Sequence, residues 1–186
     1  LFPATGYLQL AWRALAKISG QVFEQMPVAF ENVHIHRATI MPKSGVVKFL
    51  VTITPVTGQF EVSESDGLVV SGKIYIPNSP VLEVPVYERR SEEDISLTTS
   101  DIYKELRLRG YDYAGMFQGI ISATNTGDEG HLAWNGNWVT FVDTMLQIQV
   151  LSIPGRSLRL PTRIKSLRID PQVHHDRVIQ IDSERQ

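Results

Sequence analysis

The chain has 186 residues, a hydrophobic fraction of 42%, and 18 basic against 20 acidic residues, which give a formal net charge of -2. Because the charges are interspersed, no long-range field is expected to attract nucleic acid or an anionic membrane surface. The absence of cysteine excludes disulfides, thiolate nucleophiles and cysteine-based zinc sites, and no apolar run is long enough to cross a bilayer.

The first part of the chain predicts a helix followed by an antiparallel meander. Pro3 marks the helix start, apolar residues recur at helical spacing up to Ile18, and Gly20 is a stop signal. A strand follows over residues 30–36, although its alternation slips near Asn32, where we expect a bulge or a loop. Further strands are expected over residues 46–55, 59–63 and 68–76.

The second part predicts a different order of elements. Residues 77–99 lose apolar periodicity and gather prolines and charges, as an exposed connector does. A short helix capped by Thr99 or Ser100 should end at Gly110, and strands 117–124 and 130–134 should form a hairpin. A long helix over residues 138–151 follows, and its expected buried side chains are Trp138, Phe141, Val142, Met145 and Ile148.

The segments that follow the two long helices have their apolar positions in the same register. Residues 26–35 and 160–169 both place a proline at the second position of the segment and then repeat the same apolar spacing. This repeat favours two copies of one small α+β unit. The polar stretch His174-His175-Asp176 is interpreted as an exposed turn.

Four stretches resemble the dehydratase domain of animal fatty acid synthases and of the related polyketide synthases. The resemblance runs in consistent order over nearly the whole chain, and the four stretches together are specific although each alone is weak. They are Leu1-Phe2-Pro3-Ala4-Thr5-Gly6-Tyr7-Leu8, Tyr103-Lys104-Glu105-Leu106-Arg107-Leu108-Arg109-Gly110-Tyr111-Asp112-Tyr113, Phe117-Gln118-Gly119-Ile120, and Asn137-Trp138-Val139 through Asp143-Thr144-Met145-Leu146-Gln147.

The resemblance implies an α+β double hot-dog fold, in which two antiparallel sheets each wrap a long helix. Residues 1–84 would form an N-terminal hot dog, residues 85–97 a linker and residues 98–186 a C-terminal hot dog, each incomplete because the chain is expected to be truncated at both ends. The family's catalytic His would lie upstream of Leu1 and is absent from this chain. We therefore expect the chain alone to be inactive.

The family reaction removes water from a (3R)-3-hydroxyacyl thioester to give the trans-2-enoyl thioester. The resemblance assigns the proton donor to Asp143, the residue that orients it to Gln147, and active-site support to Tyr113. It places Pro3, Gly6 and Phe117 at the substrate. Apolar neighbours would raise the pKa of the Asp143 carboxyl and keep it protonated, and Gln147 at i+4 lies on the same helix face. Without the resemblance, an Asp on an amphipathic helix is more simply a solvated side chain.

One motif departs from the family pattern. The family has Tyr-Gly-Pro-x-Phe where this chain has Tyr113-Ala114-Gly115-Met116-Phe117, so the stiff proline is missing. Three functions follow as hypotheses: a fatty acid synthase dehydratase, a catalytically inactive pseudo-dehydratase that serves as an acyl-binding or structural scaffold, and a polyketide synthase dehydratase. The sequence upstream of Leu1 would discriminate the first two.

Other candidate sites have simpler interpretations. His34 and His36 lack a third ligand, so no metal site is predicted. The basic residues between Lys104 and Arg109 are interpreted as a solvated helix face, and a carrier-protein contact there, or at the basic residues between Arg156 and Arg168, is the alternative.

The resemblance also implies the partners. They are an acyl carrier protein, whose phosphopantetheine arm bears the substrate, and the other domains of a homodimeric cytoplasmic synthase. No cofactor is expected for this domain, and NADPH would serve other domains of the parent. No nucleic acid or membrane partner is expected.

Overall fold

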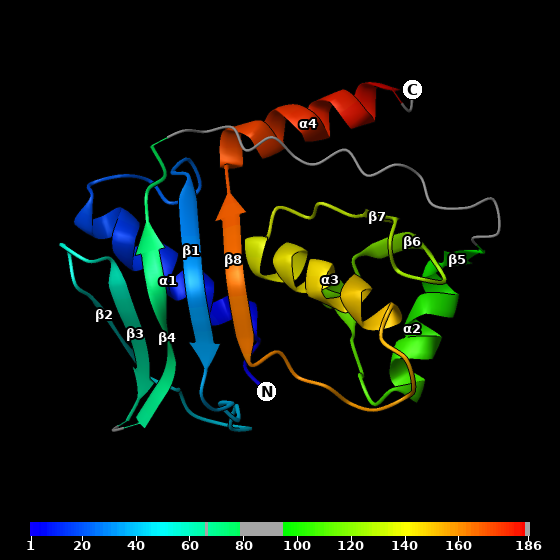
Figure 1. Ribbon diagram of the computed structural model, residues 1–186, viewed down its shortest axis with the longest axis horizontal. Coiled ribbons are helices and arrows are strands. Elements are labelled where there is room, and N and C mark those ends of the chain that lie inside the picture. The colour runs from blue at the N-terminus through cyan, green and yellow to red at the C-terminus, as the bar shows by residue number, and fades with distance from the viewer. Residues whose placement is uncertain (66, 79–94, 185–186) are drawn as a thin grey trace. The chain divides into compact units, whose positions relative to one another are not determined.

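The computed structural model describes residues 1–65, 67–78 and 95–184. The chain divides into two compact units (Figure 1), one formed by Leu1–Glu83 together with Pro161–Gln186 and the other by Val84–Leu160. Both units combine helices with antiparallel sheets, so the fold is mixed α and β. The predicted connector at residues 85–97 lies largely outside the described residues, and its last two residues belong to a strand.

The first unit holds a five-stranded sheet with the strand order β2-β3-β4-β1-β8. All of its neighbouring strands pair antiparallel. The strands are β1 (Val28–Ile35), β2 (Phe49–Ile53), β3 (Gln59–Glu64), β4 (Gly67–Tyr75) and β8 (Arg163–Ile169). The predicted meander is therefore present, and the strand that follows the second long helix closes the sheet beside β1.

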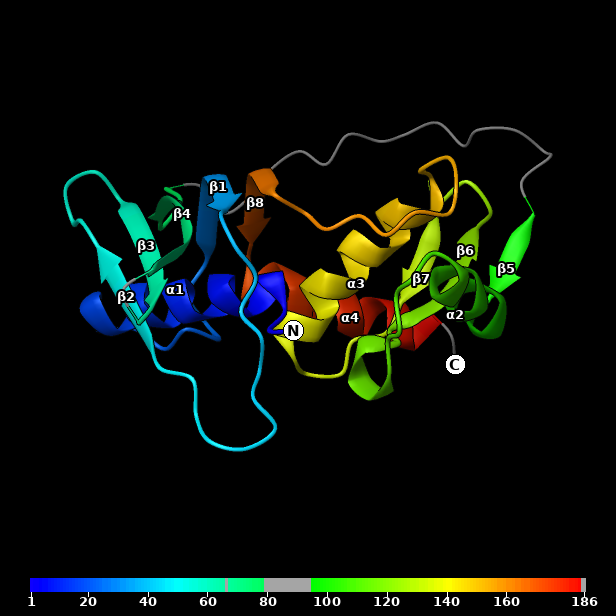
Figure 2. The same ribbon diagram turned by 90° about the horizontal axis from the view of Figure 1, so that it is seen from below.

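Helix α1 (Ala4–Ile18) crosses one face of this sheet (Figures 1 and 2). Pro3 is the N-cap, and Gly20 adopts a φ of 66°, which ends the helix at little steric cost. Trp12 is 1% exposed and donates its indole N–H to the Met26 carbonyl at 3.1 Å. The buried side chains of the sheet include Phe30, Val33, Phe60, Val62 and Ile74.

The irregularity predicted in β1 is confirmed. Asn32 adopts a φ of 48°, and the register between β1 and β4 shifts between Glu31 and His34. Asparagine tolerates the left-handed region better than most residues, because its short polar side chain bonds locally. Its carboxamide oxygen accepts a hydrogen bond at 2.9 Å from Arg163 on β8.

The two copies of the internal repeat, residues 26–35 and 160–169, pair with each other as β1 and β8. Val28 pairs with Ile169, and the positions that the repeat makes equivalent to them, Thr162 and Ile35, are joined by a hydrogen bond from Ile35 N–H to the Thr162 carbonyl at 2.9 Å.

A second set of paired residues shows the same correspondence between the two copies of the repeat. Phe30 pairs with Leu167, and the equivalent positions, Ile164 and Val33, also pair. A pairing that maps onto itself in this way has the local two-fold symmetry of an isologous contact between two copies of one element.

Two features of the C-terminal region differ from expectation. Residues 98–186 were expected to belong together, whereas β8 and α4 (Pro171–Glu184) lie in the first unit because β8 hydrogen-bonds to β1. His174-His175-Asp176 was interpreted as a turn and instead forms part of α4. Asp170 precedes this helix, its carboxylate accepts from Val173 N–H, and Pro171 is the first helical residue, which is a start signal that the interpretation overlooked.

The second unit holds a three-stranded sheet with the order β5-β6-β7 and two helices. Its elements are β5 (Ser96–Thr98), α2 (Thr99–Leu108), a short 3-10 helix η1 (Gly115–Phe117), β6 (Ile120–Thr124), β7 (Gly130–Leu132) and α3 (Trp138–Leu151). The cap of α2 is Thr98, one residue before the prediction, where Asp101 completes a capping box. Strand β6 begins later than expected because residues 115–117 form η1.

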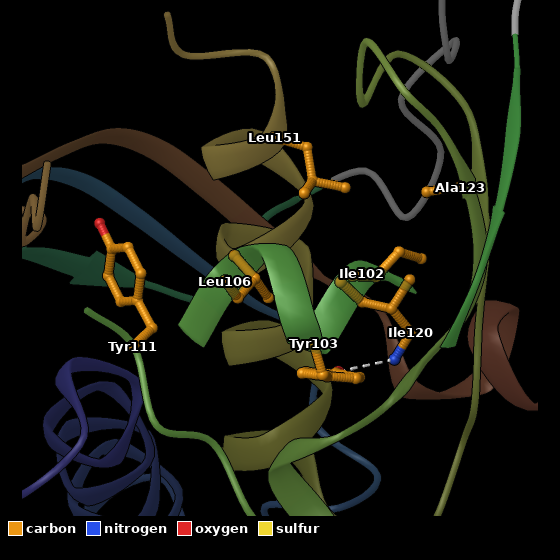
Figure 3. Close-up of a cluster of buried hydrophobic side chains, with 7 residues drawn as sticks. All are labelled: Ile102, Tyr103, Leu106, Tyr111, Ile120, Ala123 and Leu151. Carbon is orange, nitrogen blue, oxygen red and sulfur yellow. Dashed lines mark hydrogen bonds between the residues drawn. The ribbon is translucent and has the colours of Figure 1, made fainter. Parts of the chain in front are cut away.

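A cluster of buried apolar side chains joins α2, β6 and α3 (Figure 3). Its members are Ile102, Tyr103, Leu106, Tyr111, Ile120, Ala123 and Leu151. Among the described helices, none combines the length and the apolar character needed to span a bilayer.

The β1–β8 register can be tested by cross-linking, because the chain has no native cysteine. His34 and Arg163 are direct partners and both are exposed. A variant with cysteine at both positions should form a disulfide under mild oxidation, and closing a loop on the order of 100 residues should stabilise the chain by about 4–5 kcal/mol. Gel mobility with and without reductant measures the cross-link.

The matched control pairs His34→Cys with Ile164→Cys. Ile164 is the neighbour of Arg163, and successive strand residues point to opposite faces. This control should not cross-link, and efficient cross-linking in it but not in the first variant would show that the register is shifted by one residue.

Candidate functional site

Asp143 lies within α3, the helix predicted over residues 138–151 and found with those bounds. Asn137 caps this helix by accepting from the N–H groups of Val139 and Thr140 at 2.9 and 3.3 Å. Asp143 is 9% exposed, and the expected site residue Gln147 is fully buried. Met145, which was expected to be buried, is 40% exposed, because the buried face of α3 includes Asp143, Thr144 and Gln147.

The side chains of Asp143 and Gln147 are hydrogen-bonded as their spacing predicts. Gln147 Nε2 donates to Asp143 Oδ2 at 2.9 Å and to the Phe117 carbonyl at 2.9 Å. Burial raises the pKa of the Asp143 carboxyl, and the hydrogen bond from Gln147, which favours the charged form, opposes part of that effect. A carboxyl group with a raised pKa can act as a proton donor closer to neutral pH.

Tyr113 lies in the same unit, close enough for the charge of Asp143 to affect the pKa of its phenol. Its ring stacks on Tyr111 with 5.9 Å between centroids and meets Tyr103 edge-on at 6.5 Å. Burial raises the pKa of the Tyr113 phenol far above its ordinary value, and the negative charge of Asp143 raises it further. The phenol therefore stays protonated and remains a hydrogen-bond donor.

Tyr103 is a member of this site that was not among the predicted site residues. It lies on α2 and is 6% exposed. Its hydroxyl accepts from the Ile120 N–H at 3.0 Å (Figure 3) and donates to Gln147 Oε1 at 3.0 Å. The sequence feature that could have indicated this role is the hydroxyl group, since a buried tyrosine hydroxyl needs a hydrogen-bond partner.

The segment that departs from the family motif forms η1. Gly115 adopts a φ of 59°, and Met116 is 53% exposed. Asn135 Nδ2 donates to the Met116 carbonyl at 3.3 Å, and Asn135 Oδ1 accepts from Thr140 Oγ1 at 3.0 Å, so this side chain ties η1 to the first turn of α3. Phe117 contributes its backbone carbonyl, which accepts the Gln147 bond, as well as a half-buried ring.

At Gly119 the chain passes close to Thr144 on α3, the residue that follows Asp143. A Cβ atom at this position would lie 2.6 Å from Thr144 Oγ1, and that hydroxyl is held by a 2.7 Å bond to the Thr140 carbonyl. Only glycine lets the start of β6 approach the helix at this distance.

Pro3 and Gly6, the other expected substrate contacts, lie in the first unit at the start of α1. A Cβ atom on Gly6 would lie 2.6 Å from the Phe2 ring, so the missing side chain provides the space that this ring occupies. Phe2 packs against Tyr7 and Phe49 with centroid distances of 4.8 and 5.0 Å. The Tyr7 hydroxyl accepts from Thr39 N–H at 3.2 Å.

Arg109 was expected on a solvated helix face, and this interpretation is wrong. Its side chain is 11% exposed, bonds to Glu105 Oε1 at 2.9 Å and donates to the Val150 carbonyl and, at 2.8 Å, to the Ile153 carbonyl. The guanidinium thus satisfies carbonyls at the C-terminal end of α3, where a positive charge is favourable. Arg156 binds the other oxygen of Glu105 at 2.9 Å.

Replacing Gly119 by Ala should destabilise the second unit by about 1–3 kcal/mol, the usual cost of overpacking a tight contact. Thermal or urea unfolding measures the change. Pairing the substitution with Thr144→Ala, which removes both Oγ1 and Cγ2 from the contact, should recover part of the loss, whereas an unchanged stability in Gly119→Ala would contradict the close contact.

Replacing Asp143 by Asn should stabilise the chain at neutral pH, as measured by Tm across a pH series. Burial raises the folded-state pKa of Asp143 above the unfolded value of about 3.9. The stability that the protonated carboxyl supports is therefore complete below the unfolded pKa and is lost as pH rises through the folded pKa. The advantage of the Asn variant should thus shrink as pH falls.

The matched control is Asp112→Asn, because the Asp112 side chain is 89% exposed. It should show no comparable change with pH. An advantage of Asp143→Asn that does not depend on pH would contradict the raised pKa.

The comparisons with known proteins concern both units. No protein-family model matches the sequence. The dehydratase domain from the CurF module of curacin polyketide synthase superposes with a TM-score of 0.68 at 23% identity, covering 91% of this chain and 69% of that one. The dehydratase domain of RzxB from Pseudomonas fluorescens gives 0.69 at 11% identity, covering 90% and 69%.

A third solved structure agrees with these two. The dehydratase domain from the CurJ module of curacin polyketide synthase gives a TM-score of 0.64 at 19% identity, covering 89% of this chain and 64% of that one. The arrangement of Asp143, Gln147 and Tyr113 thus occurs in a chain that has the fold of polyketide synthase dehydratase domains.

Proposed function

We propose that this chain is part of the dehydratase region of a multifunctional fatty acid synthase, which removes water from (3R)-3-hydroxyacyl groups carried by an acyl carrier protein. The observation that carries the proposal is the buried Asp143 carboxyl, whose pKa is raised and which Gln147 holds by a 2.9 Å hydrogen bond. The likeness to solved dehydratase domains supports it.

The reaction needs an acid and a base. In our proposal a His upstream of Leu1 takes the proton from C2, and the electron pair of that C–H bond becomes the second bond between C2 and C3. The C3–O bond breaks as Asp143 gives its proton to the departing hydroxyl, which leaves as water. The products are the trans-2-enoyl thioester and water, and passage of a proton from the His to Asp143 restores the starting state.

The remaining residues have supporting roles in the proposal. Gln147 orients the Asp143 carboxyl, and Tyr113 offers a protonated phenol beside it. Pro3, Gly6 and Phe117 are proposed to lie along the acyl substrate. We propose no metal and no cofactor for the domain. The thioester is held by the phosphopantetheine arm of the carrier protein, and NADPH serves other domains of a homodimeric cytoplasmic parent.

We further propose a double hot-dog organisation, with residues 1–84 and 98–186 as two related halves joined by residues 85–97. The support is the self-symmetric pairing of β1 with β8, since each strand follows the long helix of its half in chain order. In this proposal β8 belongs by descent to the second half and joins the sheet of the first.

Two other functions remain candidates, each favoured by one observation. The missing proline in Tyr113-Ala114-Gly115-Met116-Phe117 favours an inactive pseudo-dehydratase that holds acyl chains or braces the synthase. The solved structures named above belong to polyketide synthases, which favours a dehydratase that acts on polyketide intermediates.

The test is an assay of the intact protein that carries this chain, following loss of a 3-hydroxyacyl thioester. Asp143→Asn should lower turnover by roughly 10²–10⁴-fold, the usual contribution of a general acid. The matched control, Asp112→Asn, should keep full activity because that carboxylate is exposed. Folded protein that binds the acyl thioester but does not turn it over, with Asp143 intact, would establish the scaffold function.

A further inference from the structure

Four groups from different elements form one chain of hydrogen bonds that ends at the Asp143 carboxyl. Ile120 N–H on β6 donates to the hydroxyl of Tyr103 on α2 at 3.0 Å, and this hydroxyl lies 3.0 Å from Gln147 Oε1 on α3. Gln147 Nε2 then donates to the Phe117 carbonyl and to Asp143 Oδ2, both at 2.9 Å. Gln147 is 0% exposed, so its amide bonds to protein groups.

The two backbone groups fix the direction of every bond in this chain. A backbone N–H can only donate, so the Tyr103 oxygen must accept from Ile120, and its own proton is free for Gln147 Oε1. A backbone carbonyl can only accept, so Phe117 must face the Nε2 side of the Gln147 amide. The Phe117 carbonyl also lies 3.3 Å from the Tyr103 hydroxyl, which is farther than Gln147 Oε1.

We propose that Tyr103 is a positioning residue, which locks the Gln147 amide so that Nε2 faces Oδ2 of Asp143 and leaves Oδ1 as the oxygen that holds and delivers the proton. This inference rests on the proposed function for the delivery step. The orientation of the amide and the identity of the proton-bearing oxygen rest on the hydrogen-bond geometry alone.

The reversed amide shows why the lock matters. With Oε1 turned toward Asp143, the protonated carboxyl would donate its proton to the Gln147 oxygen, and that proton would no longer be directed at a departing hydroxyl. With Nε2 turned toward Asp143, Oδ2 is already occupied as an acceptor, so the proton must reside on Oδ1. In the proposed reaction this proton passes from Oδ1 to the oxygen that leaves C3, and the electron pair of the O–H bond stays on Asp143.

The charges around Tyr103 support its role as a neutral donor. Burial raises the pKa of the Tyr103 phenol, the Ile120 N–H bond lowers it, and the charge of Asp143 raises it again. The hydroxyl therefore keeps its proton at physiological pH, and the proton remains available to Gln147.

The first test measures the Asp143 carboxyl directly, by following the carboxyl ¹³C resonance of aspartate-labelled chain against pH, with Asp143→Asn to identify the signal. Removing a donor from a carboxylate raises its pKa. Tyr103→Phe, which removes the partner of Gln147 Oε1 and leaves the amide held only on its Nε2 side, should raise the Asp143 pKa, and Gln147→Met should raise it further. In the Gln147→Met background, Tyr103→Phe should add nothing.

The control is Tyr111→Phe, which also removes a buried tyrosine hydroxyl from this unit. That hydroxyl donates to the Arg159 carbonyl at 2.5 Å and accepts from Arg159 N–H at 2.7 Å, and neither bond involves Gln147. It should lower stability and leave the Asp143 titration in place. An Asp143 pKa that responds equally to both tyrosine variants, or not at all to Tyr103→Phe, would overturn the proposal.

A measurement on the unaltered chain covers the case in which Tyr103→Phe does not fold. In ¹⁵N-glutamine-labelled chain, the Gln147 Nε2 resonance should shift with the ionisation of Asp143, and this response should vanish in Asp143→Asn. An Nε2 group that shows a nuclear Overhauser contact with the Tyr103 hydroxyl proton and no response to Asp143 would have the reversed orientation, which overturns the proposal.

An activity arm separates this inference from the proposed function. In the intact protein, Tyr103→Phe should lower kcat by roughly tenfold, the effect of one hydrogen bond, and should move the alkaline limb of the kcat profile to higher pH. If the titrations behave as expected and dehydration is absent in every variant, the lock stands and the proposed function fails. If dehydration occurs and Tyr103→Phe leaves its pH profile unchanged, the lock is overturned.

Discussion

The burial of one carboxyl group on α3 is the constraint on which the second unit depends. A buried carboxylate is costly unless it is hydrogen-bonded or neutralised, and Asp143 shows both responses: its pKa is raised by burial, and it accepts a bond from Gln147. Gln147 in turn is fully buried, so its own amide needs partners, which Phe117 and Tyr103 provide. The polar site is therefore satisfied as one network.

The surrounding elements are arranged so that this network can close. The approach of Gly119 to Thr144 brings the chain that carries the Phe117 carbonyl and the Ile120 N–H against α3. Arg109 binds carbonyls at the far end of the same helix, so α3 is held at both ends by side-chain hydrogen bonds. A network held at so many points favours one orientation of the carboxyl, which is the property that the proposed proton donor would need.

The first unit shows how a repeated sequence can organise a sheet. Strands β1 and β8 carry the same spacing of apolar residues, so apolar positions on one strand meet apolar positions on the other. Exchanging each residue for its equivalent in the repeat reproduces the same pairs, which is a local two-fold symmetry. The same pairing explains why the C-terminal segment lies with the first unit although it is distant in sequence. Strand hydrogen bonds across the sheet outweigh proximity along the chain.

The sequence by itself determined the local elements and the pairing of Asp143 with Gln147. Helical spacing located α1 and α3, the slip in alternation located the distortion at Asn32, and the i, i+4 spacing joined Asp143 to Gln147. These features depend on neighbours in the chain, so local pattern is sufficient to predict them. Only the tertiary structure decided which groups from other elements complete the site, namely the Tyr103 hydroxyl, the Phe117 carbonyl and the Ile120 N–H. The helical spacing of Tyr103 predicts only that its side chain is buried and does not predict the partner of its hydroxyl. Backbone N–H and carbonyl groups occur at almost every residue, so the sequence does not indicate which of them will reach the site. The meeting of these three groups is therefore decided by tertiary packing.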